Sequence, residues 1–257
     1  MVAGPFGPLE TLTRGRGAPH TVFVHGLTGS IATTRPYAGR TPGTRTFAHI
    51  AGHGRSTRPA ELSYPTLARE VWAVADDVQA DAAVGISMGA GALCAGLSSD
   101  PDRFDAVVLA LPASLDRPRV AMQEFTGLAR LVQAADSEAV TAHLLAFEPA
   151  DVADLPEVQR WCAEQAARLL AGSAAAALEA LPHQVPVADA ATLAAVEAPV
   201  LVIAQTDDEI HPVSVAEELA QVLPRARLEV FGAGGIIWAH RERVTTVVGD
   251  FLAEHTG

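Results

Sequence analysis

A serine held between two glycines is the first candidate for chemistry in this chain. Residues 85–89 read Gly-Ile-Ser-Met-Gly, directly after the apolar run 82–84 and before a stretch of small residues. A G-x-S-x-G pattern between a strand and a helix can form a sharp turn that lifts the serine hydroxyl clear of a sheet. The glycines suit such a turn because neighbouring backbones come too close for a β-carbon. The pattern predicts Ser87 as a nucleophile; the alternative interpretation is a small residue filling a tight turn.

A carboxylate partner is expected shortly after the apolar run 199–204. A serine hydroxyl is a poor nucleophile until a base removes its proton, and a carboxylate commonly orients that base and stabilises its cation. Asp208 is the predicted acid, and Asp207 is the alternative if the loop is shifted by one residue. A third interpretation is that both aspartates only cap the helix expected near residue 213.

The elements that would position these residues alternate along the chain. Apolar runs predict strands at 21–24, 44–50, 82–86, 106–111, 199–204 and 227–231, and helices are expected after residues 65, 89, 213 and 238. Most of the strand-like runs in the first half of the chain are apolar on both faces, which is typical of parallel strands covered by helices on each side. The sequence therefore predicts an α/β fold with a doubly wound, mostly parallel sheet.

This alternation stops between residues 116 and 196. The segment is Ala-rich and has no convincing strand, and its periodicity predicts helices near 119–134, 137–147 and 156–171. A helical insertion between two strands of one sheet reads as a lid over the carboxyl ends of the strands, where open α/β sheets bind ligands. The predicted organisation is therefore a core of residues 1–115 and 197–257, with a lid at 116–196.

The order of these motifs resembles the α/β-hydrolase family over nearly the whole chain. The motifs that carry the resemblance are, in chain order, a strand ending in His25 and Gly26, the segment 52–56 (Gly-His-Gly-Arg-Ser), the serine turn, the helical insertion and the Asp-containing loop 204–212. The family places its catalytic serine, acid and histidine in that order along the chain. The resemblance also implies an oxyanion site formed by the backbone N–H groups of Leu27 and Met88.

The catalytic histidine is the one part of the pattern without an obvious position. The family normally carries Gly-His in the loop after the last strand, whereas this chain has Gly234 and Gly235 there. His240 is the nearest histidine and is the predicted base, although it reaches Ser87 only if the loop is rearranged. His211, beside the acid loop, and His53, in a loop at the same edge of the sheet, are the alternatives.

The expected reaction is hydrolysis of a small or medium apolar ester, lactone or thioester through a Ser87 acyl-enzyme. The predicted lid is apolar and carries no basic cluster, which argues against charged polymers as substrates. The residues expected to border the substrate are His25, Gly26, His211 and Trp238. The alternative is a non-hydrolytic protein of the same fold, such as a small-molecule binder, a lyase or a cyclase-type enzyme, that lacks a complete Ser-His-Asp triad.

The composition of the chain limits its possible binding partners and its expected cellular compartment. The 257 residues include 30 acidic and 18 basic side chains, a formal net charge of −12, which argues against nucleic acids and anionic membranes as partners. Two cysteines can build neither a disulfide framework nor a metal cluster, so a reducing compartment is expected. Without a signal peptide or an apolar run long enough to span a membrane, the sequence predicts a cytoplasmic protein. A small-molecule substrate, no cofactor and no metal are expected, and the oligomeric state is left open.

Overall fold

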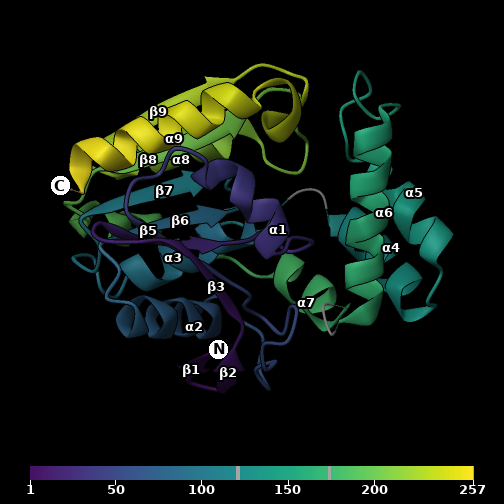
Figure 1. Ribbon diagram of the computed structural model, residues 1–257, viewed down its shortest axis with the longest axis horizontal. Coiled ribbons are helices and arrows are strands. Elements are labelled where there is room, and N and C mark those ends of the chain that lie inside the picture. The colour runs from purple at the N-terminus through teal and green to yellow at the C-terminus, as the bar shows by residue number, and fades with distance from the viewer. Residues whose placement is uncertain (120–121, 173–174, 257) are drawn as a thin grey trace.

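A seven-stranded sheet forms the centre of the computed structural model, which describes residues 1–119, 122–172 and 175–256 (Figure 1). The strand order is β3-β5-β4-β6-β7-β8-β9. The β3–β5 pair is antiparallel and the other five pairs are parallel. The strands are β3 (Thr11–Gly15), β4 (His20–Val24), β5 (Thr44–Ala48), β6 (Ala82–Ile86), β7 (Ala106–Ala110), β8 (Val200–Gln205) and β9 (Ala226–Phe231). The prediction of a mostly parallel α/β sheet is confirmed.

Helices cover both faces of the sheet, so the central strands are buried from both sides. The helices α2 (Tyr64–Asp77), α3 (Met88–Leu97) and α8 (Val213–Val222) pack into one apolar core. The helix α9 (Arg241–His255) and the short pair α1 (Ile31–Thr34) and η1 (Arg35–Ala38) pack into the other (Figure 1). Every residue of β7 and β8 is buried, which explains their continuous apolar sequences.

The segment between β7 and β8 is helical, as the sequence predicts. It contains α4 (Met122–Gln133), α5 (Ser137–Leu145), α6 (Pro156–Ala171), α7 (Ala175–Ala180), η2 (Leu181–His183) and η3 (Ala190–Ala195). Figure 1 shows α4, α5 and α6 grouped beyond one end of the sheet. The helices expected at 137–147 and 156–171 match α5 and α6; the one expected at 119–134 matches α4 from residue 122 on, while positions 120–121 lie outside the described residues. Within the described ranges, no helix is long and apolar enough to cross a bilayer.

Two parts of the fold differ from expectation. At the N-terminus, β1 (Val2–Gly4) and β2 (Gly7–Leu9) form a hairpin, and β3 extends the main sheet; these short strands lack a recognisable apolar run. After β9 the chain forms a π-helical turn, η4 (Gly235–Ala239), so that α9 begins at Arg241 and not near residue 238. Single π-helical turns are rare and occur often at functional sites.

Candidate active site

Ser87 lies in a strained turn between β6 and α3. Its backbone adopts φ 52° and ψ −107°, in the left-handed half of conformational space that most residues avoid. Its N–H donates to the carbonyl oxygen of Ala110 on the neighbouring strand at 2.9 Å. A β-carbon on Gly85 would lie 2.5 Å from the Gly89 carbonyl, and one on Gly89 would lie 2.6 Å from the Val24 oxygen. Glycine is therefore required on both sides of the serine.

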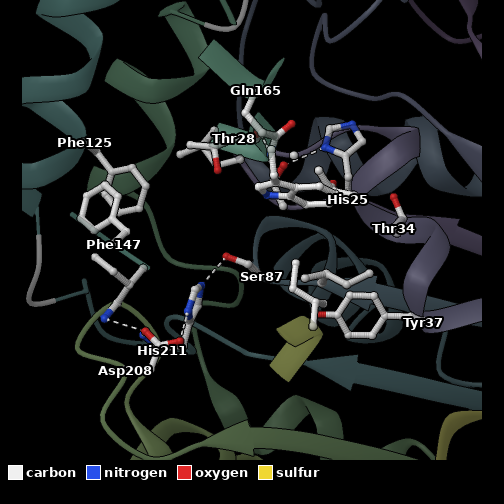
Figure 2. A pocket seen from close by; sticks show the side chains of 18 residues that line it. His25, Thr28, Thr34, Tyr37, Ser87, Phe125, Phe147, Gln165, Asp208 and His211 are labelled. Carbon is white, nitrogen blue, oxygen red and sulfur yellow. Dashed lines mark hydrogen bonds and ion pairs between the residues drawn. The ribbon is translucent and has the colours of Figure 1, made fainter. Parts of the chain in front are cut away.

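His211 connects Ser87 to Asp208 through two hydrogen bonds. The Ser87 hydroxyl lies 2.9 Å from Nε2 of His211, and Nδ1 of the same ring lies 2.8 Å from Oδ2 of Asp208 (Figure 2). Asp208 and His211 both come from the loop between β8 and α8. The strands β6 and β8 lie on either side of β7 and run parallel, so their carboxyl ends bring the serine turn and this loop to the same edge.

The surroundings of Asp208 keep its carboxylate ionised. Its second oxygen, Oδ1, accepts hydrogen bonds from the backbone N–H groups of Ile210 at 3.1 Å and His211 at 3.0 Å. Burial raises the pKa of Asp208, but the hydrogen bond and charge of the His211 ring, together with these two amides, outweigh it and lower the pKa below its usual value. An ionised Asp208 accepts the Nδ1 proton of His211, which leaves Nε2 free to take a proton from Ser87.

The structure corrects the prediction that His240 is the partner of Ser87. Nε2 of His240 hydrogen-bonds to the carbonyl oxygens of Gly232 at 3.0 Å and Ala233 at 2.8 Å, so the ring is held at the start of α9. The other alternative is His53, whose two ring nitrogens both hydrogen-bond to the backbone. Nδ1 lies 2.9 Å from the Ile50 carbonyl oxygen, and Nε2 lies 2.6 Å from the Leu27 carbonyl oxygen. Of the three histidines considered from the sequence, His211 is the one that contacts Ser87.

The loop where the family's histidine is expected has a different structure here. Gly234 and Gly235 have φ values of 103° and 79°, and a β-carbon on Gly235 would lie 2.6 Å from the Trp238 ring. The η4 turn that follows places the indole of Trp238 against the helical segment, where its N–H donates to Oε2 of Glu148 at 2.7 Å. Glycines therefore stand where a histidine is expected, and the aromatic side chain that follows them contacts the helical segment.

The backbone beside Ser87 offers two free N–H groups. A β-carbon on Gly26 would lie 3.3 Å from Cβ of Ser87, so the loop after β4 runs directly against the serine. Within the described chain, no hydrogen-bond acceptor is recorded for the backbone N–H of Leu27 or of Met88. Unpaired N–H groups next to a nucleophile are what an oxyanion site requires.

His25 supports this loop from behind. Its Nδ1 donates to the Gly26 carbonyl oxygen at 2.7 Å, and its Nε2 accepts from the N–H of Ile50 at 3.2 Å, which defines a neutral ring. Complete burial, followed by the neighbouring rings of His53 and His49, holds the pKa of His25 well below its ordinary value. The Gly26 carbonyl and the Leu27 N–H belong to one peptide group and point in opposite directions, so this hydrogen bond also orients the Leu27 N–H.

A cavity of about 220 Å³ opens beside Ser87. Its apolar walls come from both the core and the helical segment, and no arginine is among the described residues that line it. Figure 2 shows Phe125 and Phe147 on one side of the Ser87–His211 pair and Tyr37 on the other. The side chains that define its apolar character are Phe125, Phe147, Trp161, Ile210 and Ile237. His25, Gly26 and His211 line this cavity as expected, whereas Trp238 lines an adjoining one.

The model of one protein family matches most of the chain. The family is described as the alpha/beta hydrolase fold, and the match covers residues 19–237. This chain is an α/β-hydrolase. A curated relative with 30% identity over 236 residues, which covers 80% of this chain and 75% of the relative, is the 2-hydroxymuconate semialdehyde hydrolase of Pseudomonas sp. (strain CF600).

Solved structures of other α/β-hydrolases share the fold along the whole chain. The esterase EaEST from Exiguobacterium antarcticum superimposes with a TM-score of 0.80 at 19% identity, covering 98% of each chain. The enol-lactonase from Burkholderia xenovorans LB400 gives a TM-score of 0.79 at 22% identity, covering 95% of this hydrolase and 96% of that chain. At these identities the similarity concerns the fold.

Neither cysteine of the hydrolase has the surroundings of a reactive thiol. Cys94 and Cys162 are free and buried, and burial raises the pKa of each to about 12, which keeps both protonated. In the described parts of the chain, no group of three or more His, Cys, Asp or Glu side chains could hold a metal ion.

Proposed function

We propose that this α/β-hydrolase is a serine hydrolase that cleaves small or medium apolar esters, lactones or thioesters through a Ser87 acyl-enzyme. The observation that carries the proposal is the unbroken pair of hydrogen bonds from Ser87 through His211 to Asp208. A nucleophile bonded to a base, with the base oriented by a carboxylate, is the arrangement that activates a serine.

Each residue has a definite role in this mechanism. Nε2 of His211 removes the Ser87 proton as the hydroxyl oxygen attacks the carbonyl carbon, and Asp208 stabilises the resulting imidazolium. The N–H groups of Leu27 and Met88 bind the negative oxygen of the tetrahedral intermediate. His211 then protonates the leaving group, and the same sequence with water releases the acid and restores Ser87.

The cavity sets the substrate class. Apart from Asp208, His211 and the neutral ring of His25, the described residues that line it include no acidic or basic side chain, and its aromatic and aliphatic walls favour uncharged, apolar acyl groups. A volume of about 220 Å³ suits a small or medium molecule. The similar proteins include, by name, an esterase, an enol-lactonase and a 2-hydroxymuconate semialdehyde hydrolase, and esters and lactones belong to the substrate class proposed for this chain.

The helical segment at 116–196 is proposed to act as a lid on a core of residues 1–115 and 197–257. Phe125, Phe147, Trp161 and Gln165 come from this segment and line the cavity opposite Ser87. The segment thus supplies much of the wall that excludes water from the reacting carbonyl. The non-hydrolytic alternative rested on the absence of a base, and the position of His211 favours hydrolysis over it.

The direct test is covalent labelling with a fluorophosphonate, read as the intact mass of the protein. Wild type is expected to label rapidly, Ser87→Ala not at all, and His211→Ala at least about a thousandfold more slowly, because the hydroxyl loses its base. His240→Ala is the matched control and is expected to label at the wild-type rate. Labelling that survives in His211→Ala but is lost in His240→Ala would refute the assignment of the base, and an unlabelled wild type would refute the proposed function.

A further inference from the structure

A second, larger cavity adjoins the one that holds Ser87. It has a volume of about 600 Å³ and lies between the helical segment, the loop after β8 and the η4 turn. Five residues line both cavities and form the boundary between them: Tyr37, Phe147, Asp208, Ile210 and Ile237. A molecule bound at Ser87 that extends past these residues enters the second cavity.

The second cavity differs from the first in charge. Besides Asp208, the acidic residues that line it are Glu124, Glu148, Asp207 and Glu209, of which Asp207 and Glu209 are exposed. None of the described residues that line it is an arginine, and the sequence contains no lysine. The side chain of His143, the one imidazole on this wall, hydrogen-bonds to the carbonyl oxygen of Glu124 at 2.9 Å. The potential inside the cavity is therefore negative, which repels anions and attracts cations.

Aromatic rings stand among these carboxylates. The rings of Tyr37, Phe147 and Trp238 line the same cavity. Aromatic faces combined with carboxylates are the surroundings that bind substituted ammonium groups, since the cation interacts with both the ring quadrupole and the negative charge. An apolar leaving group would be stabilised by contact with the aromatic rings, but it would gain no binding free energy from the carboxylates.

Tyr37 is an independent indication of a polar ligand at the boundary. Its side chain is 3% exposed, and within the described chain no hydrogen-bond partner is recorded for its hydroxyl. Figure 2 shows this hydroxyl directed toward the centre of the site, on the side of Ser87 and His211. Because this side chain is almost wholly buried and its hydroxyl is directed into the site, a polar ligand at the boundary can hydrogen-bond to it without breaking a contact within the described protein.

Glu148 also lines the second cavity, and its carboxylate contacts two side chains. One carboxylate oxygen accepts from the Trp238 indole N–H, and the other is 4.0 Å from the Cys162 sulfur. Burial, and to a lesser extent the charge of Asp208, raises the pKa of Glu148 against the opposing effect of the Trp238 hydrogen bond. A cation beside Glu148 would stabilise the ionised form that its surroundings disfavour.

We infer that the second cavity binds a protonated amine carried by the alcohol part of an ester substrate, which is the leaving group of the reaction. Tyr37 would contact this group at the boundary between the cavities, and Glu148 would supply the principal negative charge. The second cavity is assigned to the leaving group because of its position. Its boundary includes Asp208 and lies next to His211, and His211 must protonate the leaving group. The inference rests on the proposed hydrolase function and narrows its substrates to apolar acyl esters of amino alcohols.

The test compares two esters of the same shape, dimethylaminoethyl butyrate and isoamyl butyrate, which differ in carrying an ammonium nitrogen or a carbon. At neutral pH and low salt, kcat/KM for the cationic ester is expected to exceed that for the neutral ester about tenfold, equivalent to about 1.4 kcal/mol. The ratio is expected to fall as salt is added. Glu148→Gln, which keeps an acceptor for Trp238, should bring the ratio close to one, and Tyr37→Phe should lower it about threefold.

A second Glu→Gln variant, outside the cavity, controls for the change in net charge that Glu148→Gln causes. Glu164 on α6 does not line the second cavity and pairs with Arg168, so Glu164→Gln is expected to keep the wild-type ratio. A ratio near or below one in wild type, or a ratio that Glu164→Gln lowers as much as Glu148→Gln, would overturn the inference while leaving the hydrolase function intact.

Binding to an inactive variant separates this inference from the hydrolase function. In Ser87→Ala, calorimetry is expected to show tighter binding of the cationic ester than of the neutral one, and this preference should disappear in Ser87→Ala combined with Glu148→Gln. Such a preference without turnover in wild type would support the amine site and refute the hydrolase function. Equal binding of the two esters would refute the amine site.

Discussion

At the scale of single residues, the proposed acid and the proposed base of this site come from one short loop. Asp208 and His211 are three residues apart, and the carboxylate bonds to both the ring and the backbone N–H of the same histidine. The geometry of this pair is therefore determined by residues that are close together in the chain. Asp207, the alternative acid, has a left-handed backbone with φ 60° and makes no recorded hydrogen bond to His211 in the described structure.

The two aspartates can be separated by a pair of matched substitutions. Asp208→Asn is expected to lower kcat for a neutral ester by about 10²–10⁴-fold, because His211 loses the carboxylate that fixes its tautomer and stabilises its cation. Asp207→Asn is expected to change kcat less than about threefold, since asparagine tolerates the same left-handed conformation. Steady-state kinetics of both variants provide the test, and a larger loss in Asp207→Asn would transfer the role of the acid to that residue.

At the scale of elements, the turn from β6 into α3 depends on the missing side chains of its glycines. Gly89→Ala would push a β-carbon against the Val24 carbonyl oxygen, so the variant is expected to lose about 1–3 kcal/mol of unfolding free energy through overpacking. Gly127→Ala, inside α4, is the matched control. Its β-carbon would meet only a His143 ring atom at 3.4 Å, and helix propensity predicts unchanged or higher stability by up to about 1 kcal/mol. Urea denaturation of both variants tests the contrast; equal losses would contradict it.

The helix α2 carries a buried acid that should make stability depend on pH. Glu70 is fully buried, with one oxygen accepting from the Ala51 N–H at 2.8 Å and the other without a partner. Burial raises its pKa to about 7 from 4.5, partly offset by that hydrogen bond.

Because the folded-state pKa of Glu70 is raised, its contribution to stability is complete below the unfolded pKa and is lost as the pH rises through about 7. The loss is on the order of 3 kcal/mol for a shift of this size. Glu70→Gln cannot ionise and is expected to lose less stability than wild type between about pH 5 and about pH 8. Denaturation curves at the two pH values test this, and equal pH dependence in both proteins would contradict it.

At the scale of the whole molecule, the helical segment is tied to the core beside the active site. Trp238 of η4 donates to Glu148, and its ring meets that of Trp161 on α6 edge-on at a centroid distance of 5.5 Å. These contacts hold the walls of both cavities against the core. The segment and the core thus meet at the loop where the family's histidine is expected.

Trp238→Phe keeps an aromatic ring but removes the indole N–H. The free energy of unfolding of this variant is expected to fall by about 1.5–3 kcal/mol, which is the range for a hydrogen bond to a charged group. Its amide hydrogens in α5 and α6 are also expected to exchange faster than in wild type. Trp72→Phe is the control, because its indole N–H bonds to an exposed oxygen of Asp100 far from these helices in the sequence. Hydrogen exchange that changes in neither α5 nor α6 would show that the helical segment is held by other contacts.

Local sequence patterns predicted most of the sheet and its helices. The central strands β4, β6, β7 and β8 are recognisable as apolar runs because both of their faces are covered, and the glycines around Ser87 mark a turn that tolerates no side chain. The short strands β1, β2 and β3 carry no such signal. Their positions depend on backbone pairing, such as Thr13 against Thr46, that the pattern of side chains does not encode.

The sequence by itself determined the α/β-hydrolase fold, through the order of motifs along nearly the whole chain. It also determined the serine turn and the loop that carries Asp208, because each of these depends on residues that are close in the chain. It did not determine the base. Choosing among His53, His211 and His240 requires a hydrogen-bond distance between groups far apart in sequence, and Ser87 and His211 are 124 positions apart. Only the packing of β6, β7 and β8 in register brings their loops to one edge, and it leaves His211 facing the serine while α9 holds His240 against its own loop.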